Sequence, residues 1–167
     1  ADHVHTVSKV PVLIASTTLA SNAASYTFSS IAGTFSHLEI RCTARTTDTG
    51  TNGYIGLRFN TDTGSNYRSG TSTSAYAVGI LAPASGALNT NTSSSSYIFL
   101  QNYASTTYYK TSAVLGAYDA GTSSINWAGW FQNDVWMNTS AITSITLVAV
   151  SGGNIKAGSM FSLYGIP

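Results

Sequence analysis

Charged side chains are scarce in this chain of 167 residues. Asp, Glu, Lys and Arg make up only 8% of it, against about a quarter in a typical soluble domain, and the formal net charge is +1. The seven basic residues are scattered, so the sequence has no basic patch of the kind that binds nucleic acid. Few charges also protect strand edges poorly against association, which favours an assembled protein over a free enzyme.

The sequence also has too few cysteines for an internal disulfide and no apolar run long enough for a membrane span. The single cysteine, Cys42, has no partner for an internal disulfide and is expected to be a small buried side chain. No apolar run approaches the roughly 18 residues of a membrane-spanning helix. The first residues, Ala1-Asp2-His3, show no charged-then-apolar export signal. We therefore expect neither a membrane nor a nucleic acid as a partner.

Patterns typical of catalysis are missing as well. The six acidic residues include no obvious pair for glycoside hydrolysis, and the chain has no Gly-x-Ser-x-Gly elbow, zinc-binding His/Cys cluster or phosphate-binding loop. A nucleophilic Ser or Thr needs a base, and His37 is the only histidine beyond the first five residues. The sequence predicts that the protein is not an enzyme and has no cofactor and no metal.

Two stretches nevertheless contain metal-ligand residue types. Ala1-Asp2-His3 has the free amine and imidazole that chelate Cu(II) or Ni(II), although an arm with incidental histidines is the favoured interpretation. Asn60, Asp62 and Asn66 supply oxygens suited to calcium from a glycine-bearing loop. That loop lacks the terminal Glu of an EF-hand, and Asx residues also cap turns, so a turn is favoured.

Short runs that alternate apolar and polar residues fill most of the chain and predict about ten strands and no helix. In His37–Arg45, the side chains of Leu38, Ile40, Cys42 and Ala44 share one face, and His37, Glu39, Arg41 and Arg45 share the other. In Tyr54–Asn60, Ile55, Leu57 and Phe59 are expected to point inward. In the last quarter of the chain, Ile145, Leu147 and Ala149 share one face of the first run, and Phe161, Leu163 and Gly165 share one face of the second. We expect Ser140–Val150 and Ser159–Pro167 to pair as an antiparallel hairpin that closes the domain.

Two other parts of the chain are expected to form strands. Residues 97–103 and 108–118 are expected to pair as a hairpin around residues 104–107, and residues 125–131 and 135–137 to form two further short strands.

Aromatic residues gather in the second half of the chain, where all three tryptophans occur. Large aromatics most often fill a core or a subunit interface. As an alternative, Trp127 and Trp130 are candidates for stacking on sugar rings, with Tyr108, Tyr109 and Trp136 nearby in the sequence.

Four pieces of sequence, in one order, resemble small virion proteins of tailed bacteriophages. They are the block Tyr26–Arg41, the stretch Leu57–Tyr67, the run Trp136–Leu147 and the terminal Phe161–Ile166. The resemblance implies an antiparallel jelly-roll-like β-sandwich that serves as a structural or binding module. Proteins of this class include head decoration (cement) proteins and domains of tail and fibre proteins. The chain has no fibrous shaft repeat or coiled-coil stem, which favours head decoration.

On this basis we expect residues 1–10 to form an extended N-terminal arm and residues 11–167 a single β-sandwich domain. The protein would be made in the bacterial cytoplasm and would sit on the outer capsid surface of the virion. Its expected partners are the major capsid protein and further copies of itself in a homotrimer. The alternative is a tail fibre, receptor-binding or carbohydrate-binding module. The expected capsid-contact residues are Ala1, Asp2, His3, Val4, His5, Thr6, Val7, Ser8 and Lys9.

Overall fold

The computed structural model describes residues 10–49, 53–69, 72–74, 77–82, 91–119 and 127–167. The side chains of residues 72–82, Asp119, Trp127, Ala128 and Trp130 lie outside that description. The described part contains no helix. Its twelve strands are β1 (Val12–Thr18), β2 (Ser25–Phe28), β3 (His37–Ala44), β4 (Gly53–Phe59), β5 (Tyr67–Ser69), β6 (Ser72–Ser74), β7 (Ala77–Ala82), β8 (Ser94–Gln101), β9 (Lys110–Asp119), β10 (Trp127–Trp136), β11 (Ile145–Ala149) and β12 (Met160–Ile166).

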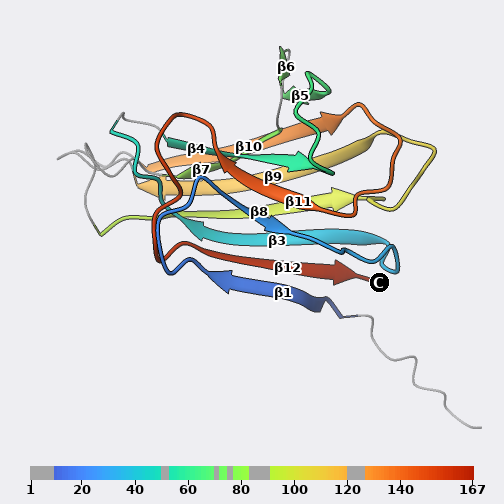
Figure 1. Cartoon of the computed structure of the whole chain (residues 1–167), viewed down its shortest axis with the longest axis horizontal. Coiled ribbons are helices and arrows are strands. Elements are labelled where there is room, and N and C mark those ends of the chain that lie inside the picture. The colour runs from blue at the N-terminus through green and yellow to red at the C-terminus, as the bar shows by residue number, and fades with distance from the viewer. Residues whose placement is uncertain (1–9, 50–52, 70–71, 75–76, 83–90, 120–126) are drawn as a thin grey trace, which may run out of the picture.

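The strands form two antiparallel sheets that pack as a jelly-roll-like β-sandwich, as the sequence predicted. The larger sheet has eight strands in the order β1-β12-β3-β8-β9-β10-β5-β6. Figure 1 shows its six longer strands one after another, from β1 to β10. The smaller sheet has the order β2-β11-β4-β7 and covers one face of the larger one. The other face of the larger sheet is left uncovered by strands of the described chain.

The core lies between the sheets and is built from the inward positions of the alternating strands. Leu38, Ile40 and Cys42 of β3 are buried, as predicted, and Cys42 is the free cysteine. In β12, Phe161 and Leu163 point into the core from the larger sheet, and Leu147 of β11 meets them from the smaller one. Period-two alternation therefore assigned these side chains to the correct face.

Aromatic side chains close one end of the core. Trp136, Tyr67 and Phe59 are buried with ring centroids 5.5 to 6.4 Å apart. The Tyr67 hydroxyl accepts a hydrogen bond from the Phe59 amide at 2.9 Å and donates to the Asp62 carbonyl at 3.1 Å. Trp136 is thus a core residue, the role that the sequence favoured for large aromatics.

The predicted C-terminal hairpin is wrong. Both of its strands exist, but β11 pairs with β2 and β4, whereas β12 pairs with β1 and β3 in the other sheet. The segment between them crosses the sandwich and is fixed where Ile155 bridges Ala23 and Thr46. Gly153 has a positive φ of 75°, and a Cβ there would lie 2.8 Å from the Thr47 hydroxyl, so this crossing requires glycine.

Of two other strand predictions, one is confirmed and one is wrong. The hairpin predicted around residues 104–107 is confirmed, because β8 and β9 pair from Ser95 opposite Ala117 to Gln101 opposite Thr111. The two short strands predicted near residues 125–131 and 135–137 are in fact one continuous strand, β10. Of the expected arm, residues 1–10, only Val10 is described, and residues 1–9 lie outside the described residues.

Candidate binding surface

The uncovered face of the eight-stranded sheet carries large side chains in a row that crosses four strands. Antiparallel register places Phe131 of β10 opposite Leu115 of β9, Leu115 opposite Tyr97 of β8, and Tyr97 opposite Arg41 of β3. Directly opposite residues on neighbouring strands have side chains on the same face. We call these four residues the ridge. On β12 the row continues with the small residue Ser162, opposite Arg41.

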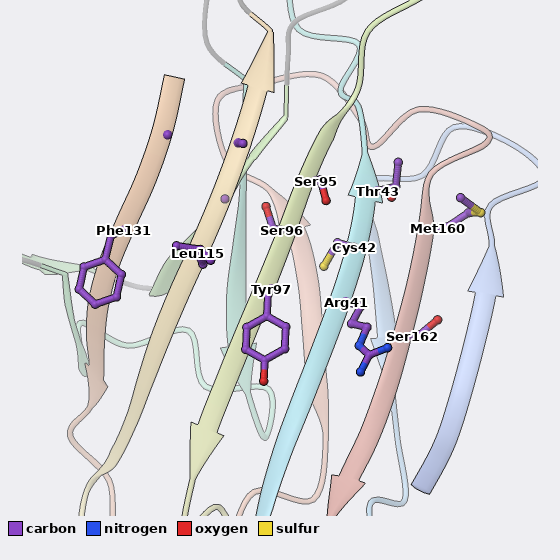
Figure 2. Close-up of a pocket in the computed structure, with 13 residues that line it drawn as sticks. Arg41, Cys42, Thr43, Ser95, Ser96, Tyr97, Leu115, Phe131, Met160 and Ser162 are labelled. Carbon is purple, nitrogen blue, oxygen red and sulfur yellow. The ribbon is translucent and has the colours of Figure 1, made fainter. Parts of the chain in front are cut away.

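A row of small residues lies next to the ridge, two positions along each strand. Gly129, Ala117, Ser95 and Thr43 are opposite one another across β10, β9, β8 and β3, and we call them the trough. On β12 this row ends in a large residue, Met160, opposite Thr43. Ridge and trough together line a groove of about 820 Å³, whose floor also includes Cys42, Ser96 and Gly116. Figure 2 shows Phe131, Leu115, Tyr97 and Arg41 along this groove.

Four large apolar side chains of the groove are strongly exposed to solvent. Phe131 is 71% exposed, Leu115 59%, Met160 48% and Tyr97 38%. Single exposed apolar residues are common on protein surfaces, but a contiguous apolar patch marks an interaction site. Because these four residues share one groove, they form such a patch.

The polar end of the ridge is fixed by contacts within the face. Arg41 Nε donates to Glu39 Oε1 at 2.5 Å, and the Tyr97 hydroxyl donates to Glu39 Oε2 at 2.9 Å. The Arg41 guanidinium also lies 4.5 Å from the centre of the Tyr164 ring. Burial and then the bond to Glu39 raise the pKa of Tyr97, and the same carboxylate raises the pKa of Arg41. The opposite charges of Arg41 and Glu39 therefore offset each other within the face.

The prediction that Glu39 and Arg45 lie on a solvated face is wrong. Both were expected on a solvated face, but Glu39 is only 5% exposed and Arg45 only 7%. Glu39 is covered because Tyr97 and Arg41 bond both of its oxygens. Arg45 lies just beyond the end of β3, where its Nη1 donates to the Thr92 carbonyl at 3.1 Å.

A second exposed apolar region lies at the edge of the same sheet. β1 is the terminal strand and pairs only with β12 in the described structure. Val12 and Leu13 are exposed there, as is Val10, the last residue of the expected arm. The register shifts between Leu13 and Ala15, which is a bulge in the edge strand.

The structure describes only some of the candidate binding residues singled out from the sequence. Ala1–Lys9 lie outside it. The backbones of Trp127 and Trp130 belong to β10, opposite Asp119 and Gly116, but their side chains are also outside the description. Tyr108 and Tyr109 are exposed in the connection between β8 and β9 and do not line the groove.

The loop Asn60–Asn66 is a turn stabilised by its own side chains. Asp62 Oδ1 accepts from the Gly64 amide at 2.9 Å, which is the Asx turn expected from the sequence, and both Asp62 oxygens accept from Asn66. Asn60 Oδ1 instead accepts from the Thr143 amide at 2.8 Å. The oxygens of Asn60 and Asp62 are therefore engaged with different parts of the chain and do not converge on one point.

A buried polar cluster lies on the inward side of β10. Gln132 Nε2 donates to Asp134 Oδ1 and, at 2.5 Å, to the Ser69 hydroxyl. Asp134 is 1% exposed, and burial raises its pKa to about 6 even though hydrogen bonds from Gln132, Ser69 and Ser112 oppose that shift. Neighbouring Lys110 is also buried, and its Nζ donates to the carbonyls of Tyr108, Asn138 and Thr139.

Among the described residues no group of three or more His, Cys, Asp and Glu side chains is arranged to hold a metal ion. No helix long and apolar enough to cross a membrane occurs in that part of the chain. The chain matches no protein-family model, and no curated protein or solved structure is significantly similar to it. The exposed groove and the edge strand β1 are thus the two candidate binding surfaces.

Proposed function

We propose that the chain is a bacteriophage virion structural protein, a capsid decoration protein that binds the outer shell across capsid subunits and stabilises the head. The observation that carries this proposal is the terminal strand β1. Its apolar residues Val12 and Leu13 are 46% and 53% exposed, and Val10, just before it, is 61% exposed. The sandwich itself is the fold that the phage resemblance implies.

An edge strand of this kind suits attachment to another protein. One side of β1 is bonded to β12, and the backbone groups of its other side are available to an added strand. Edge strands that face water usually carry charges that discourage pairing, whereas Val12–Thr18 contains none. A capsid protein segment paired there, together with contacts from residues 1–9, would cover both the open backbone and the exposed apolar side chains.

Attachment would stabilise the head by mass action. A protein that binds the assembled shell, and does not bind the dissociated subunits, adds a free energy of RT ln(1 + [L]/Kd) in favour of the shell. No chemical step is needed, so neither a catalytic group nor a cofactor takes part. The major capsid protein is the proposed partner, and the outer capsid surface is the proposed location.

The test uses heads of the encoding phage that lack this chain. We expect the full chain to co-sediment with such heads, and we expect binding to fall at least about tenfold for a chain without residues 1–9 and for the double variant Val12→Ser/Leu13→Ser. The matched control is Tyr108→Ser/Tyr109→Ser, which removes exposed apolar area away from β1. Thermal unfolding checks that every variant is folded. Equal binding by all four chains would contradict the proposal.

A second candidate is a tail fibre, receptor-binding or carbohydrate-binding module. The observation in its favour is that β10, which contains Trp127 and Trp130, also places the 71%-exposed ring of Phe131 in the groove. Aromatic rings on a sheet face are suited to stacking on sugars. Binding to a glycan array that is lost in Trp130→Ala, with folding intact, would support this candidate over decoration.

A further inference from the structure

The ridge and the trough have complementary shapes. In each of the five strands that cross the groove, one row contributes a large side chain and the other a small one. The pairs within a strand are Phe131 and Gly129, Leu115 and Ala117, Tyr97 and Ser95, Arg41 and Thr43, and, with the order reversed, Ser162 and Met160. The large residues stay in one row from β10 to β3 and move to the other row at β12.

We propose that this face is an interface between two copies of the chain, in which the ridge of each copy fills the trough of the other. A two-fold axis that runs across the strands, between the two rows, achieves this. Rotation about that axis turns the second sheet to face the first and exchanges the positions of the rows. Each strand then lies over its own counterpart, with Phe131 over Gly129, Leu115 over Ala117 and Tyr97 over Ser95. In an isologous interface of this kind, residue i contacts j and j contacts i.

The charge on the face is compatible with a second copy. Among the described side chains in and next to the groove, the charged ones are Arg41 and Glu39, which form an ion pair with N and O atoms 2.5 Å apart. As far as the side chains are described, two such faces meet without an excess of either charge. The axis places Arg41 of one copy over Thr43 of the other, so the two guanidinium groups are not opposed. The described side chains of this face therefore offer no surface of opposite charge to a strongly charged partner.

The available area is sufficient for a stable dimer. The five strands that carry the groove, each about 4.8 Å wide, make a face about 24 Å across, and the eight residues of β8 are about 27 Å long. The face therefore measures about 650 Å² per copy. Stable interfaces bury about 600 to 1,000 Å² per partner, so the face lies within the required range if most of it is covered.

This inference does not rest on the proposed function, because it uses a different surface. Decoration would use the edge strand β1, and the two-fold contact uses the face of β12, β3, β8, β9 and β10. It does differ from the stoichiometry expected from the sequence. A homotrimer was expected, whereas the exchange of ridge and trough closes with two copies.

The first test measures the mass of the full chain by analytical ultracentrifugation over a range of concentrations. We expect a dimer, and we expect Ala117→Phe to weaken it at least about tenfold, because the added ring occupies the space needed by Leu115 of the second copy. Ala117 is exposed and its neighbours across the sheet are Gly129 and Ser95, so the single chain accommodates the ring. The matched control is Tyr108→Phe, an aromatic change outside the groove.

Ala117→Phe separates shape from general adhesion, since it adds apolar surface. If the face were merely adhesive, the variant would associate as strongly as the original chain or more strongly, and the proposal would be overturned. A monomer at all concentrations, or a trimer, would overturn it as well. A chain that stays monomeric and binds glycans at the groove would assign the face to a sugar instead.

A second measurement tests the two-fold geometry directly. Residue 97 of one copy is expected opposite residue 95 of the other, so a short bismaleimide should join Tyr97→Cys and Ser95→Cys chains when they are mixed. A linker is used because facing sheets lie about 10 Å apart, beyond the reach of a disulfide. The control mixes Tyr97→Cys with Gln101→Cys, whose cysteines are expected about 20 Å apart along the strands, and this mixture should cross-link much less. Cys42 is buried and does not compete. Equal cross-linking in the two mixtures would contradict the arrangement.

Discussion

The substitution Asp134→Asn is expected to stabilise the protein at neutral pH. Asp134 lies on the inward side of β10, is 1% exposed, and accepts a hydrogen bond from Gln132. No cationic side chain bonds to this carboxylate among the contacts described for it. Burial without a positive partner disfavours the charged form, which is why the pKa of Asp134 is raised to about 6.

The size of the effect follows from the difference between the folded and unfolded pKa values. The carboxylate has a pKa near 3.8 when it is free and about 6 in the folded chain. The folded state therefore binds more protons over this range, so its stability is greatest below about pH 4 and falls as the pH rises through about 6. The loss amounts to roughly 3 kcal/mol. The amide introduced by Asp134→Asn keeps the site neutral but replaces one acceptor oxygen by a donor, which costs about 1 kcal/mol. A net gain of about 2 kcal/mol is expected above about pH 7.

Urea denaturation of both chains at several pH values measures this effect. The difference in free energy of unfolding between variant and original chain should rise from about zero or below at about pH 4 to about 2 kcal/mol at about pH 7.5. Taking this difference at each pH cancels groups that titrate alike in both chains, including Asp62, whose pKa is lowered by hydrogen bonds from Trp136, Asn66 and Gly64 against the opposing effect of burial. A difference that is independent of pH would refute the reasoning.

Two further substitutions test the packing of the core. Gly165→Ala should reduce the free energy of unfolding by about 1 to 3 kcal/mol, because a Cβ there would lie 2.4 Å from the Phe35 ring. Adding Phe35→Leu to this variant should recover part of the loss. If the two substitutions instead have additive effects in urea denaturation, the contact between residues 35 and 165 is contradicted. Asp62→Ala should cost about 1 to 3 kcal/mol, since it removes the acceptor 2.8 Å from Trp136 Nε1 and the cap of the loop. An unchanged denaturation midpoint would show that water replaces the carboxylate.

Alternation along single strands was the part of the structure that the sequence predicted well. The inward side chains of β3, β4 and β12 were assigned correctly because a period of two depends only on neighbours in the chain. The turn at Asp62 was predictable for the same reason, since its acceptor and donors lie within four residues. Burial of Cys42 followed from its place in such a strand.

Pairing between distant strands was not predictable in this way. β11 and β12 are close in sequence and both alternate, which favoured a hairpin, but each finds better partners far away in opposite sheets. The ridge depends on the same long-range information. Alternation places Tyr97 and Arg41 outward one at a time, and only the register of β10, β9, β8 and β3 shows that they are aligned with Leu115 and Phe131.

Buried polar groups were also missed, because part of what covers or bonds them comes from other segments. Glu39 looks like a solvated residue in its own strand, yet Tyr97 of β8 covers it. Lys110 looks equally exposed, but its ammonium group is satisfied by carbonyls of Tyr108, Asn138 and Thr139. Their burial shows that a charged residue type in an alternating pattern does not by itself identify a wet face.

Cryo-electron microscopy of virus particles purified from the source of this chain tests the proposed function most directly. The proposal predicts density for the sandwich on the outer capsid lattice, with β1 and the preceding residues against capsid subunits. Density confined to the tail tip would contradict decoration and would favour the receptor-binding candidate.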